Sequence, residues 1–145
     1  MIAGNANHDL ADGIAEWLDV KLEKSDIRRF SDGEINIHVH ENVRGADVFI
    51  IQPMCPPNVN DNIMELLLLI HTLRLSSAKR VTAIVPYYAY GRQDRFFALS
   101  KQLTRFHTEL NRKVKPRVPI SASVVAQLME VRAHNMILHI IFNLV

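Results

Sequence analysis

The chain has 145 residues, 48% of them hydrophobic and 22% charged, which is the composition of one globular domain with its own apolar core. Its single cysteine, Cys55, excludes an internal disulfide. No apolar run reaches membrane-spanning length, and residues 1–20 lack the basic start and apolar stretch of a secretory signal. We therefore expect a cytoplasmic protein that does not contact a membrane.

The formal net charge of +2 conceals one strongly basic segment. Residues 95–117 carry seven lysines and arginines against a single acid, Glu109, which makes this segment +6 and the rest of the chain −4. A connecting segment of this kind can contact phosphates, but it can also be a solvated loop.

The first half of the chain alternates between helical and extended patterns. Residues 2–7 predict a short strand and a turn, and residues 8–18 predict an amphipathic helix. Residues 35–40 (INIHVH) alternate strictly between apolar and polar side chains, as in a half-buried strand. Residues 47–52 (DVFIIQ) are almost continuously apolar, as in a strand that is covered on both faces.

A long helix follows a loop with several prolines. Asn60 or Asp61 can cap this helix, and Glu65 lies where its carboxylate can support the first turn. One side of the helix carries Met64, Leu67, Leu68 and His71, and the neighbouring Leu66, Leu69, Ile70 and Leu73 widen its apolar surface.

The rest of the chain repeats the alternation of strand and helix. Residues 80–87 and 136–142 predict buried strands, and residues 120–132 predict a helix between them. Strands that alternate with helices predict an α/β fold, with a parallel sheet covered by helices. The inner face of the second helix is expected to carry Val124, Val125, Leu128 and Met129.

Two segments are candidates for a ligand site at the carboxyl ends of the strands. Residues 87–95 (YYAYGRQDR) directly follow a buried strand. Arg92 could lie over an adenine ring by a cation–π contact, and Gln93 could offer amide donors. The alternative is a surface turn with a local pair between an arginine and an aspartate.

The second candidate segment is residues 30–34 (FSDGE). Gly33 permits a tight turn, Phe30 could stack on a base, and Asp32 or Glu34 could accept a hydrogen bond from an exocyclic amine. The alternative is an ordinary strand entry with a buried phenylalanine.

The histidines offer only weak candidates for a metal site. His38 and His40 share one face of a strand, where they could bind a metal or simply face solvent. His139 lies in a late apolar strand and could be a ligand or a core histidine. No GxxxxGK[ST] motif is present, which excludes a Walker-type nucleotide site.

Several longer segments resemble one enzyme family in their order and spacing. These are FSDGE, ENVRGADVFIIQP, NDNIMELLLLI, SSAKRVTAIVPYYAYGRQDR and PISASVVAQLME. They are similar to the ribose-phosphate pyrophosphokinases (PRPP synthetases), over roughly residues 2–95 and 113–131. The resemblance implies a phosphoribosyltransferase-like fold, in which residues 1–145 form one N-terminal domain. It also implies transfer of diphosphate from ATP to ribose 5-phosphate with Mg²⁺, giving PRPP for nucleotide biosynthesis.

The resemblance also implies roles for individual residues. The family's ATP-binding residues correspond to Phe30, Asp32, Gly33, Glu34, Arg92 and Gln93. In the family the loop that corresponds to residues 30–34 reaches in from a neighbouring subunit, so we expect a homo-oligomer, or a hetero-oligomer with a full-length paralogue. Arg44 matches an arginine near a regulatory anion site, which is a looser correspondence.

The chain departs from the family pattern in three places. Residues 96–112 are expected to be an inserted loop. His139 comes earlier than the family's metal-binding histidine and lacks the aspartate that precedes it, so the metal ligands stay unknown. The C-terminal catalytic half has no counterpart in this chain, so we expect no catalytic residue here, and ribose 5-phosphate to bind only when a complete second half is supplied.

Two alternative functions remain open from the sequence. One is a non-catalytic regulatory subunit that associates with PRPP synthetases. The other is a nucleic-acid-binding module built from the basic segment and its aromatics Phe96, Phe97 and Phe106. We do not expect nucleic acid as a partner, because the family resemblance explains the flanking sequence better.

Overall fold

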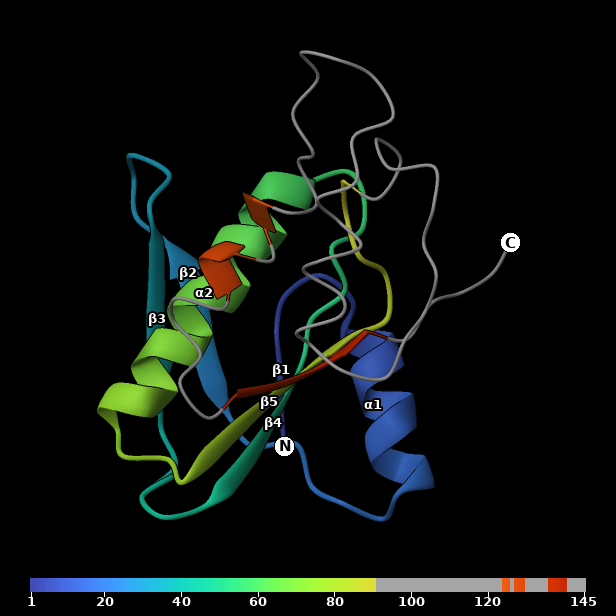
Figure 1. The fold of residues 1–145 in the computed structure, drawn as a ribbon, viewed down its shortest axis with the longest axis vertical. Helices are drawn as coiled ribbons and strands as arrows, with labels where there is room; N and C mark the ends of the chain where they lie inside the picture. Colours follow the sequence, from blue (N-terminus) through green and yellow to red (C-terminus); the bar gives the residue numbers. More distant parts are fainter. Residues whose placement is uncertain (91–123, 126, 130–135, 141–145) are drawn as a thin grey trace.

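The computed structural model describes residues 1–90, 124–125, 127–129 and 136–140. Its centre is a four-stranded parallel sheet with the strand order β1-β4-β5-β6 (Figure 1). The four strands are β1 (Ile2–Ala3), β4 (Asp47–Ile51), β5 (Arg80–Val85) and β6 (Met136–Ile140). The expected α/β fold with a parallel sheet is confirmed, including the strand expected near residues 136–142.

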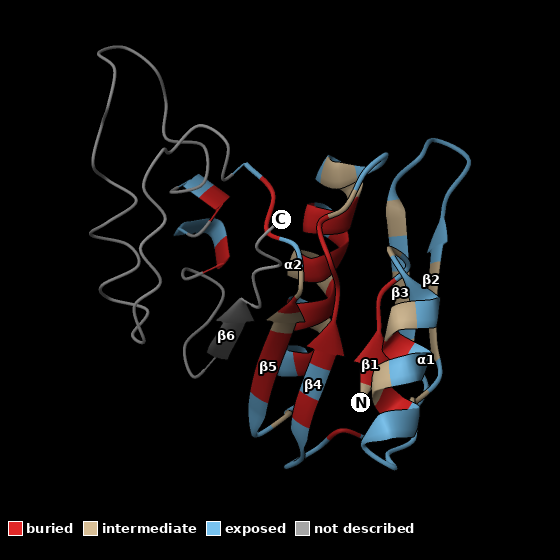
Figure 2. Cartoon of the chain, turned by 90° about the vertical axis from the view of Figure 1, so that its right-hand side faces the viewer, coloured by how far each residue is buried: buried red, intermediate tan, exposed pale blue. Residues whose placement is uncertain are grey.

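The two long helices cover opposite faces of this sheet. Consecutive residues of a strand point to opposite faces, so Ile50 and Ile51 of β4 face different layers. Ile50 packs in the larger core with helix α2 (Val59–Leu75), and Ile51 packs in a smaller cluster with helix α1 (His8–Trp17). Figure 2 shows the resulting stripe of buried residues through β4, β5 and α2.

Beside the sheet, an antiparallel hairpin packs against α2. It consists of β2 (Ser25–Arg29) and β3 (Ile35–Val39). The half-buried side chains of Ile27, Ile37 and Val39 pack against the larger core, whereas Asn36 and His38 are exposed. The sides expected for β3 are therefore correct, but β2 was not expected from the sequence.

Helix α2 differs from its sequence-based description in two respects. Its N-cap residue is Asn58, without a side-chain capping bond, so the expectation that Asn60 or Asp61 caps the helix is wrong. Its apolar surface is also less completely buried than the sequence suggests, because Met64 and His71 are exposed. The buried apolar residues of α2 are Ile63, Leu66, Leu69, Ile70 and Leu73.

The second predicted helix is described only at residues 124–125 and 127–129, which are helical. Val125 and Met129 are buried, as expected, but Val124 and Leu128 are half exposed. Residues 96–112, where we expect an inserted loop, lie outside the described residues. Among the described helices, none is both long and apolar enough to cross a membrane.

Candidate nucleotide-binding site

The turn at residues 30–34 joins β2 to β3 at the edge of the molecule where α2 begins (Figure 1). The parallel strands β4 and β5 end toward the same edge, as both views show (Figures 1 and 2). Ligands of open α/β sheets bind at the carboxyl ends of the strands. The fold therefore places this turn on the side where a ligand is expected.

Hydrogen bonds between its own residues hold this turn. The Phe30 N–H donates to the Glu34 carbonyl at 2.8 Å, and the Gly33 N–H donates to the Phe30 carbonyl at 3.0 Å. The Glu34 N–H donates to Asp32 Oδ1 at 3.0 Å, so one oxygen of this carboxylate stabilises the turn. Gly33 has a φ of 94°, a conformation that residues with a Cβ rarely adopt.

The side chain of Phe30 is 53% exposed. This exposure rules out the alternative in which Phe30 is a buried residue at an ordinary strand entry. A large apolar ring at an exposed turn has its face available to a planar ligand. Ser31, Asp32, Gly33 and Glu34 are exposed as well, so the whole turn is accessible.

Arg29 connects this turn to helix α2, a contact that the sequence did not predict. Its Nη1 donates to the Gly33 carbonyl at 3.3 Å, and its Nη2 lies 2.8 Å from Asp61 Oδ2. Asp61 lies in the first turn of α2, where a negative charge is favoured by the helix dipole. The feature of the sequence that could have indicated this contact is the position of Arg29, two residues after the core-facing Ile27.

A buried polar cluster lies between α2 and the ends of β1 and β4. Glu65 is only 4% exposed, and its Oε1 accepts from the Asn5 N–H at 2.6 Å and from Gln52 Nε2 at 2.9 Å. Gln52 Oε1 in turn accepts from the Ala6 N–H at 3.3 Å. Burial raises the pKa of the Glu65 carboxyl, and the hydrogen bonds from Asn5 and Gln52 partly offset this effect. Glu65 thus joins three elements and does not act as the expected support of the first helical turn.

The same cluster reaches the hairpin through Asn5. Its side chain Nδ2 donates to the Ile27 carbonyl in β2 at 3.0 Å. The hairpin that carries the 30–34 turn is therefore held at two points, by Asn5 near its middle and by Arg29 near its turn. Neither contact follows from a local sequence pattern, because each joins residues that are far apart in the chain.

The start of the second candidate segment lies against the N-terminal end of α2. The Met54 N–H donates to the Tyr87 carbonyl at 2.8 Å, and the Tyr90 hydroxyl hydrogen-bonds to Asn60 Oδ1. Tyr88 is 5% exposed, and this burial raises the pKa of its hydroxyl. Arg92 and Gln93, the residues expected to contact adenine, lie outside the described residues.

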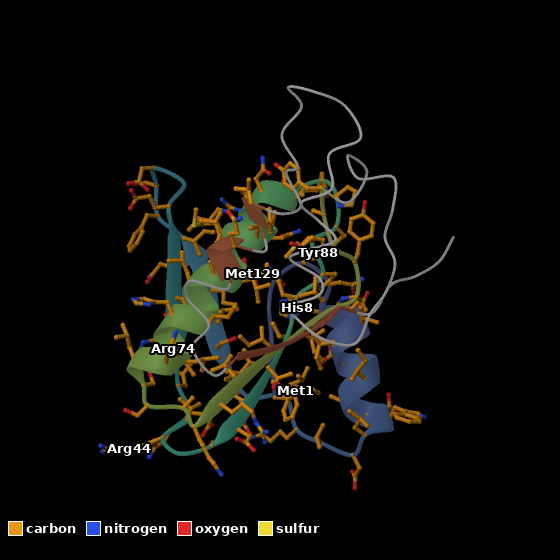
Figure 3. All side chains as sticks on the ribbon, viewed as in Figure 1. Met1, His8, Arg44, Arg74, Tyr88 and Met129 are labelled. Carbon is orange, nitrogen blue, oxygen red and sulfur yellow. The ribbon has the colours of Figure 1, made fainter. Side chains whose placement is uncertain are left out.

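Arg44, the candidate for a regulatory anion site, lies far from this edge. It is exposed in the loop before β4, at the opposite end of the sheet from the 30–34 turn (Figure 3). Its N–H donates to Asn42 Oδ1 at 3.1 Å. An anion bound near Arg44 would therefore not belong to the nucleotide site.

His38 and His40 lie on the exposed face of the hairpin. Their rings meet edge to face at 4.6 Å, and His40 Nε2 lies 3.1 Å from Asp26 Oδ2. The hydrogen bond from His40 lowers the pKa of the Asp26 carboxyl. Across the described part of the chain, no three histidine, cysteine or acidic side chains gather as metal ligands would. His139 lies in β6, in register with Ile84, and its side chain is outside the described part.

Comparison with known proteins gives a consistent result. Residues 1–104 match the model of the N-terminal domain of ribose phosphate pyrophosphokinase. The chain is 47% identical over 131 residues to the ribose-phosphate pyrophosphokinase of Haemophilus influenzae, covering 90% of this chain and 36% of that protein. It is 45% identical over 130 residues to the enzyme of the same name from Helicobacter hepaticus, with the same coverage.

A solved structure agrees with these sequence comparisons. The crystal structure of phosphoribosylpyrophosphate synthetase from Mycobacterium smegmatis is similar with a TM-score of 0.77 and 32% sequence identity. The match covers 97% of this chain and 47% of that one.

The chain spans little more than a third of the length of the curated relatives. It belongs to the family of the N-terminal domain of ribose phosphate pyrophosphokinase.

Proposed function

We propose that this chain is the ATP-binding and oligomerising half of a ribose-phosphate diphosphokinase. The complete enzyme would transfer the diphosphate of ATP to ribose 5-phosphate, giving PRPP for nucleotide biosynthesis. Family membership supports this proposal, and the observation that carries it is the exposed 30–34 turn at the carboxyl edge of the sheet. The relatives are named as the enzyme itself, which does not favour the alternative of a non-catalytic associated subunit.

In this proposal the turn recognises the adenine of ATP. Phe30 stacks on the base, because its exposed ring offers a π-face at little conformational cost. Asp32 Oδ1 already accepts the Glu34 N–H, so Oδ2 and the Glu34 carboxylate are the acceptors for an exocyclic amine. Gly33 keeps the turn tight enough for its backbone to approach the ligand. Arg92 and Gln93, in the segment that follows Tyr90, complete the site, and in the proposed oligomer they come from a neighbouring subunit.

The reaction itself requires alignment of the attacking hydroxyl and stabilisation of the charge on the phosphates. The described residues do not fit a protein-held metal centre, because they contain no cluster of metal-ligating side chains. Mg²⁺ typically binds through substrate phosphates and one or two carboxylates, so we propose that it enters as the ATP complex. Ribose 5-phosphate would bind only where a complete second half is supplied.

The proposal includes assembly into oligomers. An exposed turn forms only one side of an ATP site. A second subunit can supply the rest of the site. We therefore propose a homo-oligomer or a hetero-oligomer with a full-length paralogue. Arg44 is proposed as part of a separate regulatory anion site, because it is exposed at the opposite end of the sheet.

Calorimetric titration of the 145-residue chain with Mg²⁺–ATP tests this function, with size exclusion run in parallel. Replacing Phe30 by leucine keeps an apolar side chain but removes the stacking ring, and we expect ATP to bind at least about five-fold more weakly. Arg92→Ala should weaken binding as well. The matched control is Phe49→Leu, because Phe49 is the other described phenylalanine and is also partly exposed, at 43%.

Two outcomes of this titration would count against the proposal. Equal loss of affinity in the Phe30 and Phe49 variants would indicate a general effect of destabilisation and would count against recognition by the turn. A folded wild-type chain that does not bind ATP would overturn the proposal.

A further inference from the structure

Arg29 connects the 30–34 turn to helix α2. Side chains alternate along a strand, so Arg29 lies on the same face of β2 as the core-facing Ile27. That face points toward α2, and Arg29 Nη2 lies 2.8 Å from Asp61 Oδ2. The neighbouring Arg28 lies on the other face, where it pairs with Asp26 at 3.5 Å.

The same guanidinium also holds the turn itself. Arg29 Nη1 donates to the Gly33 carbonyl at 3.3 Å, while Nη2 contacts Asp61. The hydrogen bonds of Phe30, Gly33 and Glu34 join residues of the turn to one another, whereas Arg29 joins the turn to a different element. A planar guanidinium presents two separate nitrogens to two acceptors in a fixed geometry, whereas the ammonium of lysine donates from a single nitrogen on a flexible stem.

The residue before Asp61 makes a parallel contact to the other candidate segment. Asn60 Oδ1 accepts the hydrogen bond from the Tyr90 hydroxyl, immediately before the segment that carries Arg92. The first turn of α2 therefore contacts residues 87–95 through Asn60, and through Asp61 it contacts Arg29, which in turn holds the 30–34 turn. This helix is a rigid reference, because its inner face is buried in the core.

We infer that Arg29 is a positioning residue, which fixes the 30–34 turn against the first turn of α2 through Asp61. The importance of this role for ATP rests on the proposed function, but the role itself is structural and can be measured separately. Both members of the pair are nearly half exposed, at 46% each, so solvent screens their attraction. The effect of breaking the pair should therefore be confined to the turn and should leave the core unchanged.

Amide hydrogen exchange of the full 145-residue chain tests this inference directly. Arg29→Lys and Asp61→Asn should speed exchange of the Phe30 and Gly33 amides by about two- to five-fold, as expected for loss of a weak surface ion pair. Arg28→Lys is the matched control, because it makes the same chemical change one residue away and on the opposite face. Exchange in β4 and β5 should not change in any of the three variants.

The same variants are then titrated with Mg²⁺–ATP. Arg29→Lys and Asp61→Asn should weaken ATP binding by about two- to five-fold, while Arg28→Lys should not. Unchanged exchange at Phe30 and Gly33 would overturn the inference, and so would faster exchange shared equally by β4 and β5. If wild-type chain does not bind ATP, the proposed function fails, and the exchange rates still decide the role of Arg29.

Discussion

Two glycines illustrate how strongly the surroundings of one residue decide its tolerance to change. A Cβ added to Gly4 would lie 2.0 Å from Gln52 Oε1 and 2.9 Å from Glu65 Oε1, both in the buried polar cluster. A Cβ added to Gly13 in α1 would meet nothing within 4 Å. Gly4 is therefore required by packing, whereas Gly13 only lowers helix propensity.

Opposite changes in stability are expected for the two alanine variants. Gly4→Ala must displace hydrogen-bonded side chains and should lower the free energy of unfolding by about 1–3 kcal/mol. Gly13→Ala should raise it by about 0.5–1 kcal/mol, because alanine restricts the unfolded chain and favours the helix. Urea denaturation of both variants measures the difference, and a Gly4→Ala protein as stable as the wild type would refute the packing role.

Residues in locally defined conformations could be predicted from the sequence, and residues defined by tertiary contacts could not. Gly33 and the turn around it follow from the local preference of glycine for positive φ. Glu65 was assigned to the helix N-terminus by its position in the sequence, but its partners Asn5 and Gln52 lie in the segments that follow β1 and β4. Arg29 was missed for the same reason, because its partner Asp61 belongs to α2.

At the scale of elements, apolar patterns predicted most strands but not the hairpin partner β2. The sequence of β2 is SDIRR, in which Ile27 is the single apolar residue, so no alternation is visible. Helix α2 shows the opposite case. Every position from Leu66 to Ile70 is apolar, so the sequence pattern does not indicate which side faces the core.

The contact of α2 with β1 and β4 through Glu65 predicts a dependence of stability on pH. Burial raises the pKa of this carboxyl in the folded state above its usual value near 4.5. The folded chain therefore binds the Glu65 proton more tightly than the unfolded chain, so this stabilising contribution is present below the unfolded pKa and is lost as the pH rises through the folded pKa.

Glu65→Gln should remove this dependence, because an amide does not titrate. The stability of the wild type relative to Glu65→Gln should therefore fall as the pH rises above about 4.5. Urea denaturation at several pH values measures both proteins. A difference that stays constant over this range would show that the carboxyl is not perturbed by burial.

At the scale of the whole molecule, the chain corresponds to 36% of the length of its curated relatives. A phosphoryl-transfer site needs groups that clamp the phosphates and groups that hold the acceptor, and the described residues supply candidates only for adenine recognition. The activity of the relatives should therefore not be expected from this chain by itself.

Purified 145-residue chain should form no PRPP from ATP and ribose 5-phosphate. Transfer of diphosphate releases AMP, so AMP formation that depends on ribose 5-phosphate measures the reaction. The full-length enzyme of Haemophilus influenzae serves as the positive control at equal concentration. Steady AMP release by the short chain, above a reaction without ribose 5-phosphate, would contradict the assignment of this chain to the ATP-binding half.

The order of strands in the sheet also has a consequence for how the chain is made. Val81 of β5 pairs with Met136 of β6, so the hydrogen-bonding edge of β5 stays open until much later residues leave the ribosome. Synthesis at about 5–20 residues per second leaves that edge exposed for several seconds. During that interval the open edge of β5 can pair with strands of other chains, so association is most favoured before residues 136–140 are made.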